Sequence, residues 1–319
     1  MLGGILVAGS ISAQTLTDVI NEFNVGVDKV NNQEYDASLE HFNQVLLLAE
    51  TVGDSAAEMK ANAEKLIPAS YYKQAKMFLK RSQYDNAIPY LENTITTATL
   101  YDNNAESKQK ANKYLMQSYV REAQHNYKNK AYNESLAFYD KALAMKENLY
   151  QAHLGKGMVY KDMDEIDSML EEFAIAKEGA LARNDTKTIG TANKAIDKYF
   201  NTIIKEEFEA IDPEEPEYEY VVEACANALN ANPDNARAYY YLASIYNKKI
   251  EFDLAIESAQ KGLSSETEAV WISALNFELG NAFQNTAEYD KACETLKKVM
   301  EEPFLTRAEK KMGSLPGCN

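Results

Sequence analysis

The sequence has little cysteine, glycine or proline. Its 319 residues include 3 cysteines, 13 glycines and 7 prolines. Cys225, Cys293 and Cys318 are far apart and form no CxxC pair, which excludes a disulfide framework and a cysteine-rich zinc site. We expect two buried thiols and one tail thiol, although a Cys293–Cys318 bridge stays open if the tail folds back. The low glycine and proline contents exclude a collagenous or low-complexity chain.

Positive charge is scarce. Lysine and arginine total 33 against 49 aspartates and glutamates, which gives a net charge of −16 at pH 7. An acidic protein is repelled by the phosphates of nucleic acids and by anionic lipid surfaces, so we expect neither as a partner. The hydrophobic share of 45% and the charged share of 26% are those of an ordinary globular protein.

No hydrophobic run is long enough to span a membrane, which takes roughly 20 residues in a helix. The longest apolar start, LGGILVAGSISA at 2–13, fits the hydrophobic region and cleavage site of a secretory signal, with the cut before Gln14. No lysine or arginine lies near Met1, as such signals usually have. A buried first helix is the alternative, and its glycines disfavour it. We therefore expect residues 1–13 to be a signal-like segment and the protein to be exported, to a periplasm, with a cytoplasmic location as the alternative.

The sequence also lacks motifs for catalysis, cofactors or metals. The three histidines His41, His125 and His153 are not clustered with each other, with cysteine or with paired carboxylates, as zinc sites and nucleophiles require. No nucleophile elbow, zinc-protease helix or glycine-rich phosphate loop occurs after residue 13. The acidic loop DPEEPEYE at 212–219 lacks the ligand pattern of a calcium loop. We expect no enzyme activity, no cofactor and no metal.

What the sequence does contain is a repeat. An aromatic residue is followed three positions later by a small residue and four positions after that by a large apolar one. This spacing places the three side chains on one face of a helix. Clear copies begin at Tyr35, Tyr84, Tyr132, Phe252 and Tyr289, and weaker copies begin at Ile166 and Tyr218.

A second amphipathic helix precedes most copies and carries its own small residue. These small residues are Gly26, Ala75, Ala123, Gly157, Ala243 and Gly280. The breaks at Asn232-Pro233 and Pro303 are typical of helix stops. The pattern therefore predicts successive pairs of helices with close contact at the small residues.

These motifs resemble the tetratricopeptide repeat (TPR), and the stretch from Ala228 to Leu263 carries the clearest copy. The resemblance covers about residues 18–303, and with the signal-like start it indicates the exported bacterial type of the family. It implies an all-α solenoid of TPR-like helical hairpins, with about seven repeats across 14–303. Residues 304–312, FLTRAEKKM, would form a capping helix, and residues 313–319 a flexible tail.

The repeat spacing departs from the family period of 34 residues. Successive turn residues are 49, 48, 34, 52, 34 and 37 residues apart. The insertions have helix-favouring sequence, so we expect helices prolonged by roughly two turns each. The fifth unit, around Tyr218, is the weakest because its first helix has no obvious small residue.

The resemblance implies a partner protein or peptide bound along a concave groove that the first helices line. The register gives these groove candidates: Tyr72, Lys76, Gln124, Tyr127, Tyr240, Ser244, Asn247, Phe277, Asn281 and Gln284. Exposed aromatics offer large contact area, and amides can bond a peptide backbone. Most of the 21 tyrosines are explained more simply as wedges between helices.

The carboxylate clamp found in some family members is missing. Its lysine positions hold Tyr72, Val120, Leu154, Tyr240 and Phe277 here, which argues against an adaptor for chaperone tails. We therefore predict a non-catalytic protein-interaction scaffold in the bacterial cell envelope. The alternatives are a glycan-binding envelope protein and a cytosolic TPR adaptor. Self-association through a poorly capped end stays open.

Overall fold

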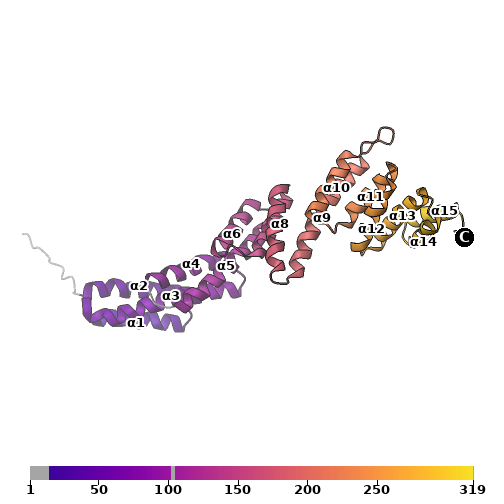
Figure 1. Cartoon of the computed structure of the whole chain (residues 1–319). Helices are drawn as coiled ribbons and strands as arrows, with labels where there is room; N and C mark the ends of the chain where they lie inside the picture. Colours follow the sequence, from indigo (N-terminus) through magenta and orange to yellow (C-terminus); the bar gives the residue numbers. More distant parts are fainter. Residues whose placement is uncertain (1–13, 102–104, 319) are drawn as a thin grey trace, which may run out of the picture. The chain divides into compact units, whose positions relative to one another are not determined.

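The computed structural model describes residues 14–101 and 105–318. The signal-like segment expected at residues 1–13 lies outside the described residues. The described part of the chain consists of α-helices and one short 3-10 helix, with no strand (Figure 1). This confirms the predicted all-α class and its architecture of TPR-like helical hairpins.

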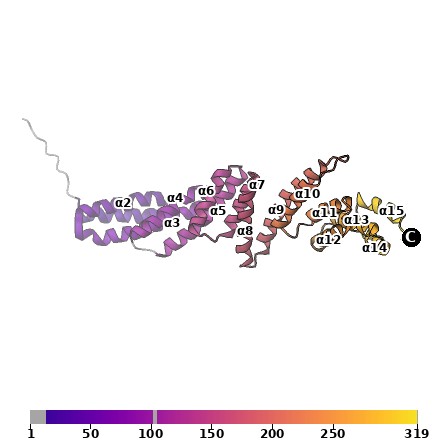
Figure 2. The same cartoon turned by 45° about the horizontal axis from the view of Figure 1, so that its top comes forward.

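The chain divides into two compact units, one up to Val159 and one from Tyr160 onward. In the first unit, each helix from α1 to α5 packs against the next helix along the chain, and α1 to α4 lie side by side (Figures 1 and 2). Its elements are α1 (Leu16–Asn31), α2 (Tyr35–Val52), η1 (Gly53–Ala56), α3 (Ala57–Lys80), α4 (Tyr84–Leu100), α5 (Ala105–Lys128), α6 (Tyr132–Met145) and α7 (Tyr150–Asp162), whose last residues enter the second unit.

The second unit continues the alternation of first and second helices. Its helices are α8 (Ile166–Leu181), α9 (Thr186–Glu209), α10 (Glu219–Ala231), α11 (Ala236–Lys248), α12 (Phe252–Ser265), α13 (Ala269–Asn285), α14 (Tyr289–Leu296) and α15 (Phe304–Met312). Hairpins α9/α10, α11/α12 and α13/α14 pack internally, and α11 also packs against α13.

The turns of six hairpins, all except α9/α10, follow one backbone pattern. A turn residue of the repeat, such as Tyr84 or Phe252, is the first residue of the second helix. Two positions before it stands a residue with positive φ, for example Ser82 at 58°. The next residue donates its N–H to a carbonyl five residues back, as Gln83 does to Phe78 at 3.0 Å. This is the Schellman ending of a helix, and it needs a left-handed residue in each of these six hairpins.

The left-handed position before α12 is held by Ile250, at φ 63° and 74% exposed. A β-branched side chain is strained in this region by roughly 1–2 kcal/mol, whereas asparagine tolerates it. We expect Ile250→Asn to raise the free energy of unfolding by about 1 kcal/mol, measured by urea denaturation. Ile250→Val keeps the β-branch and should give no gain. An equal gain from valine would contradict the strain argument.

The long repeat spacings come from long first helices. Helices α3, α5 and α9 have 24 residues each, whereas α7 and α11 have 13. This confirms the predicted prolongation. The sequence showed no obvious small residue in the first helix of the fifth unit, α9. In the structure, Ala192 and Ala195 of this helix are buried.

The small residues of the first helices allow close helix contact. A Cβ atom at Gly26 would lie 2.7 Å from the ring of Phe42, and one at Gly280 would lie 2.7 Å from Leu296. Both distances are too short for a real contact, so these two positions require glycine for the helices to pack as they do.

The C-terminal tail is packed, whereas the sequence indicated a flexible segment at 313–319. Cys318 forms a disulfide with Cys293 of α14, the bridge that the sequence left open. Leu315 and Cys318 are buried in the same hydrophobic cluster as α13 and α15. Cys225 is a free thiol in α10, and burial raises its pKa to about 12.

Candidate functional site

The first two groove candidates lie on α3 of the N-terminal unit. The half-buried ring of Tyr72 is 6.2 Å from that of Tyr114 on α5, measured between centroids. Lys76 is exposed, and its Nζ lies 5.9 Å from the centre of the Tyr72 ring. Burial first, and then the Tyr114 phenol, raise the pKa of Tyr72, with Lys110 acting against them. The result is a neutral aromatic surface bordered by ammonium groups.

Gln124 and Tyr127 lie on α5, and both are half-buried. Gln124 accepts a hydrogen bond from Arg121 at 3.2 Å. It lines a polar hollow of about 370 Å³ between α5 and the α3–α4 turn. The Tyr127 ring lies 6.2 Å from that of Tyr132, the turn aromatic of the same hairpin. These two candidates are therefore accessible only in part.

On α11, Tyr240 is surrounded by other rings. Its centroid lies 5.0 Å from that of Tyr241, 5.4 Å from that of Trp271 and 6.0 Å from that of Phe304. Burial raises the pKa of Tyr240, with a further contribution from the carboxylate of Glu278. Ser244, one turn further along α11, is 7% exposed.

A carboxylate connects the candidate amides of α11 and α13. Asn247 donates from Nδ2 to Oε2 and to the backbone oxygen of Glu278, both at 2.9 Å. Asn281 donates to the same Oε2 at 3.2 Å. Among the described residues, the buried Oδ1 atoms of Asn247 and Asn281 have no hydrogen-bond partner. Each amide oxygen therefore remains able to accept a hydrogen bond.

The rest of this face is covered by α15. Phe277 is 1% exposed, with the guanidinium of Arg307 4.3 Å from its ring centre and the Phe304 ring 5.9 Å away. Lys311 donates to Oε1 of Gln284 at 3.2 Å. Phe304, Arg307 and Lys311 are three and four positions apart, so they form one stripe along the helix.

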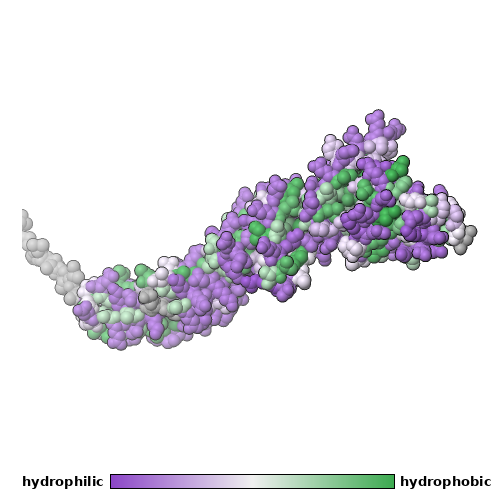
Figure 3. Space-filling model, viewed as in Figure 1, coloured by the Kyte–Doolittle hydropathy of each residue, from purple (hydrophilic) through white to green (hydrophobic). Residues whose placement is uncertain are grey.

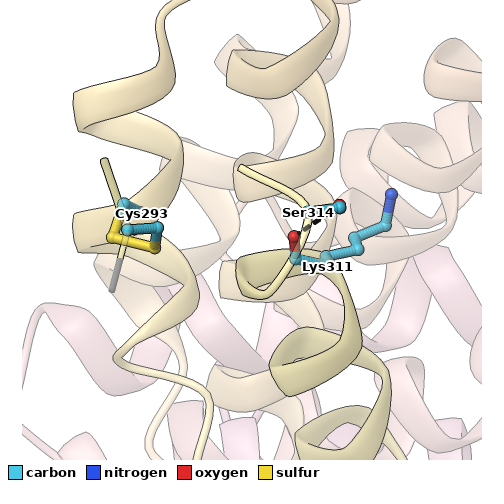
Figure 4. Close-up of a disulfide and its surroundings, with 4 residues drawn as sticks. Cys293, Lys311 and Ser314 are labelled. Carbon is cyan, nitrogen blue, oxygen red and sulfur yellow. Dashed lines mark hydrogen bonds between the residues drawn. A yellow bond between two sulfur atoms is a disulfide. The ribbon is translucent and has the colours of Figure 1, made fainter. Parts of the chain in front are cut away.

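The tail that follows α15 is fixed at two points, one next to the end of α15 and one at Cys318. Ser314 donates its hydroxyl to the backbone oxygen of Lys311 at 2.7 Å, and the Cys293–Cys318 disulfide ties the tail to α14 (Figure 4). The candidate face of α11 and α13 is thus occupied by a helix of its own chain.

The candidates therefore fall into two groups. Tyr72, Lys76, Gln124 and Tyr127 are at least partly exposed, whereas Phe277 and Ser244 are buried and Tyr240 lies under Phe304. The sequence reasoning missed two contributors. Tyr114 lies outside the repeat register, in the prolonged part of α5. Glu278 follows a groove position directly and was assigned no role.

The described residues include neither a metal-ligand cluster nor a membrane-spanning helix. No group of three or more histidines, cysteines, aspartates or glutamates among them is placed to hold a metal ion. None of the described helices combines the length and hydrophobicity needed to cross a membrane.

No protein-family model and no curated protein sequence matches the chain. Solved TPR structures do match it. The MamA protein is 21% identical, with 62% of this chain and 94% of MamA covered and a TM-score of 0.32. The TPR2AB domain of yeast Sti1, solved as a complex with pHSP90, is 15% identical over 93% of this chain and 94% of that one, with a TM-score of 0.33.

A TPR repeat-containing protein from Cytophaga hutchinsonii matches through its C-terminal part. It is 13% identical over 90% of this chain and 98% of that structure, with a TM-score of 0.32. TM-scores this low say nothing about what the chain binds. The description as TPR-like hairpins rests on the recurring motif and on the turns and packing described above.

Proposed function

We propose that this chain is a non-catalytic scaffold that binds a partner protein through the first-helix face of its N-terminal unit. The observation that carries the proposal is the position of α15. In the C-terminal unit, the groove positions Tyr240, Phe277 and Gln284 already bind an amphipathic helix. In the N-terminal unit, Tyr72 holds the repeat position of Tyr240 and Phe277, and Tyr127 holds that of Gln284.

The character of α15 indicates what such a face accepts. It contributes one buried aromatic ring, Phe304, and two cations, Arg307 and Lys311, which lie over an aromatic ring and beside an amide. Rings on a groove bind apolar and cationic side chains well. We infer that the partner presents a helix or peptide with an aromatic residue next to basic ones.

The test is in-cell photo-crosslinking from position 76 of the full chain. We expect one specific partner adduct, lost at least tenfold when Tyr72→Ala and Tyr127→Ala remove the aromatic surface. The matched control carries Leu47→Ala and Leu100→Ala, which remove exposed side chains from the second helices α2 and α4. Both variants must keep the helical circular-dichroism spectrum of the parent.

Three results would count against the proposal: no protein adduct, equal loss in the control variant, or unchanged capture by the tyrosine variant. Binding of oligosaccharides that depends on Tyr72 would favour the glycan-binding alternative instead.

We further propose that the protein is exported to the bacterial cell envelope. The signal-like start supports this, and so does the Cys293–Cys318 disulfide, because such bridges persist in oxidising compartments. Mass spectrometry of the purified protein tests it. A mature N-terminus at Gln14 is expected, whereas a retained Met1 would favour the cytosolic alternative.

A further inference from the structure

A second surface lies on the side of the second helices in the C-terminal unit. A groove of about 840 Å³ separates α8 from α10, and α9 forms its floor. Hydrophobic residues gather over α8 and again over α9 and α10, in surroundings that are mostly hydrophilic (Figure 3). This volume is within the range of sites that hold small molecules or short peptides.

The two walls of the groove differ in chemistry. On α8, Ile166, Leu170 and Ala174 form an apolar stripe, with Ile166 38% exposed. On α10, the opposite wall presents the exposed amide side chains of Asn227 and Asn230. An apolar wall facing amides fits a peptide whose side chains bury on one side while its backbone bonds on the other.

The amides favour an extended segment over a helix, because a helix satisfies its own backbone groups and an extended chain does not. The α8 wall from Ile166 to Lys177 is about 17 Å long at 1.5 Å per residue. At about 3.3 Å per residue, this length takes about five extended residues.

The charged residues that line the groove are unevenly placed along it, which would orient a bound peptide segment. Asp164 and Asp167 line the groove beside the start of α8, and Tyr199 donates its hydroxyl to Asp164 at 2.7 Å. Farther along the wall, Lys177 donates to the backbone oxygen of Ala231 at 3.1 Å. Burial lowers the pKa of Lys177, against the effect of nearby Asp197.

Because Asp197 and the carbonyl end of α10 already offset the charge of Lys177, the charge left for a ligand is negative. That charge is concentrated at Asp164 and Asp167. A lysine or arginine side chain complements it.

We propose that this groove binds an extended, basic segment of a partner protein, about five residues long. Its apolar side chains lie against Ile166, Leu170 and Phe200, its backbone bonds to the amides of α10, and a lysine or arginine meets the two aspartates. The site is separate from the first-helix face and does not rest on the function proposed for it.

The probe is a phage-displayed library of random nonapeptides, selected on the immobilised full chain. We expect enriched peptides to share a lysine or arginine followed by apolar residues at alternate positions. In fluorescence anisotropy, Leu170→Ser should weaken their binding at least tenfold. Asp164→Asn with Asp167→Asn should weaken it about fivefold at low salt and less at high salt. The control Leu181→Ser changes a 68% exposed leucine of α8 outside the groove and should have no effect.

Several outcomes would overturn the proposal. These are no enrichment, enrichment of acidic peptides, or equal effects of Leu170→Ser and Leu181→Ser with unchanged circular dichroism. A dimer of the free protein that Leu170→Ser dissociates would make a second copy the occupant. Loss of peptide binding in the Tyr72→Ala, Tyr127→Ala variant would move the peptides to the first-helix face, so failures at the two sites are distinguishable.

Discussion

Replacing Cys293 and Cys318 together with serine is expected to lower the unfolding free energy of the C-terminal unit by about 3 kcal/mol. The two cysteines are 25 residues apart, so the bridge restricts a loop of moderate length in the unfolded chain. The loop includes Phe304, Ala308 and Leu315, all buried in the cluster that joins α13 to α15. Losing the bridge frees the segment that covers the α11–α13 face.

The single tryptophan makes this measurable. Trp271 lies in α13 and packs against the same cluster, so its fluorescence reports on the C-terminal unit. In urea, the oxidised parent should unfold at a higher midpoint than the double serine variant, and the two unfolding free energies should differ by the amount given above. Reductant should lower the parent's midpoint and leave the variant's unchanged. Equal midpoints for oxidised and reduced parent would show that the bridge adds no stability.

The repeat made most of the fold predictable. Most turn residues are the first residue of a second helix, as Tyr35 and Tyr289 are, because the pattern is local and recurs. Tyr218 is the exception, since α10 begins one residue later, at Glu219. The extra length between Tyr35 and Tyr84 was predicted to be helical because AAEMKANAEKL favours helix. Prolines were less informative. Pro303 precedes α15 as a stop should, but Pro68 and Pro89 lie inside helices.

The sequence predicted where the candidate face of α11 and α13 lies, but not that α15 covers it. The register placed Tyr240 and Phe277 on the first-helix side, and the structure brings them together under Phe304. Which helix covers them depends on contacts between residues far apart in the sequence. The sequence predicted a capping helix at 304–312 but not the helices on which it packs, because a capping helix can pack on either helix of the last hairpin.

The groove between α8 and α10 could not be predicted from the sequence, because it too depends on contacts between residues far apart in the chain. Ile166 and Leu170 have the spacing of an ordinary buried helix stripe. Only the packing of α9 beneath them leaves this stripe partly open. Asn227 and Asn230 had no motif of their own. A groove between helices depends on how those helices pack, and no local sequence pattern shows this.

Phe304→Ala is expected to release α15 from the first-helix face at a cost of roughly 3 kcal/mol, at the lower end of measured phenylalanine truncations. Phe304 is 9% exposed and contacts the rings of Tyr240 and Phe277, so its loss leaves a cavity between them. The disulfide still ties the tail to α14, so the helix should detach locally rather than unfold the unit. Hydrogen exchange should rise across 304–312, and the emission of Trp271 should shift to longer wavelength.

The control is Leu305→Ala, which shortens a half-buried neighbour on the same helix outside the cluster. It should change neither exchange nor emission by more than a small amount. If Phe304→Ala behaves like the control, the Phe304 ring does not hold α15 in place. The proposal that the N-terminal unit binds a partner helix in the same way would then lose its support. If α15 detaches, the rings of Tyr240 and Phe277 become accessible. The C-terminal face would then be able to bind a helix in trans, and a synthetic peptide of residues 303–313 should bind the variant and not the parent.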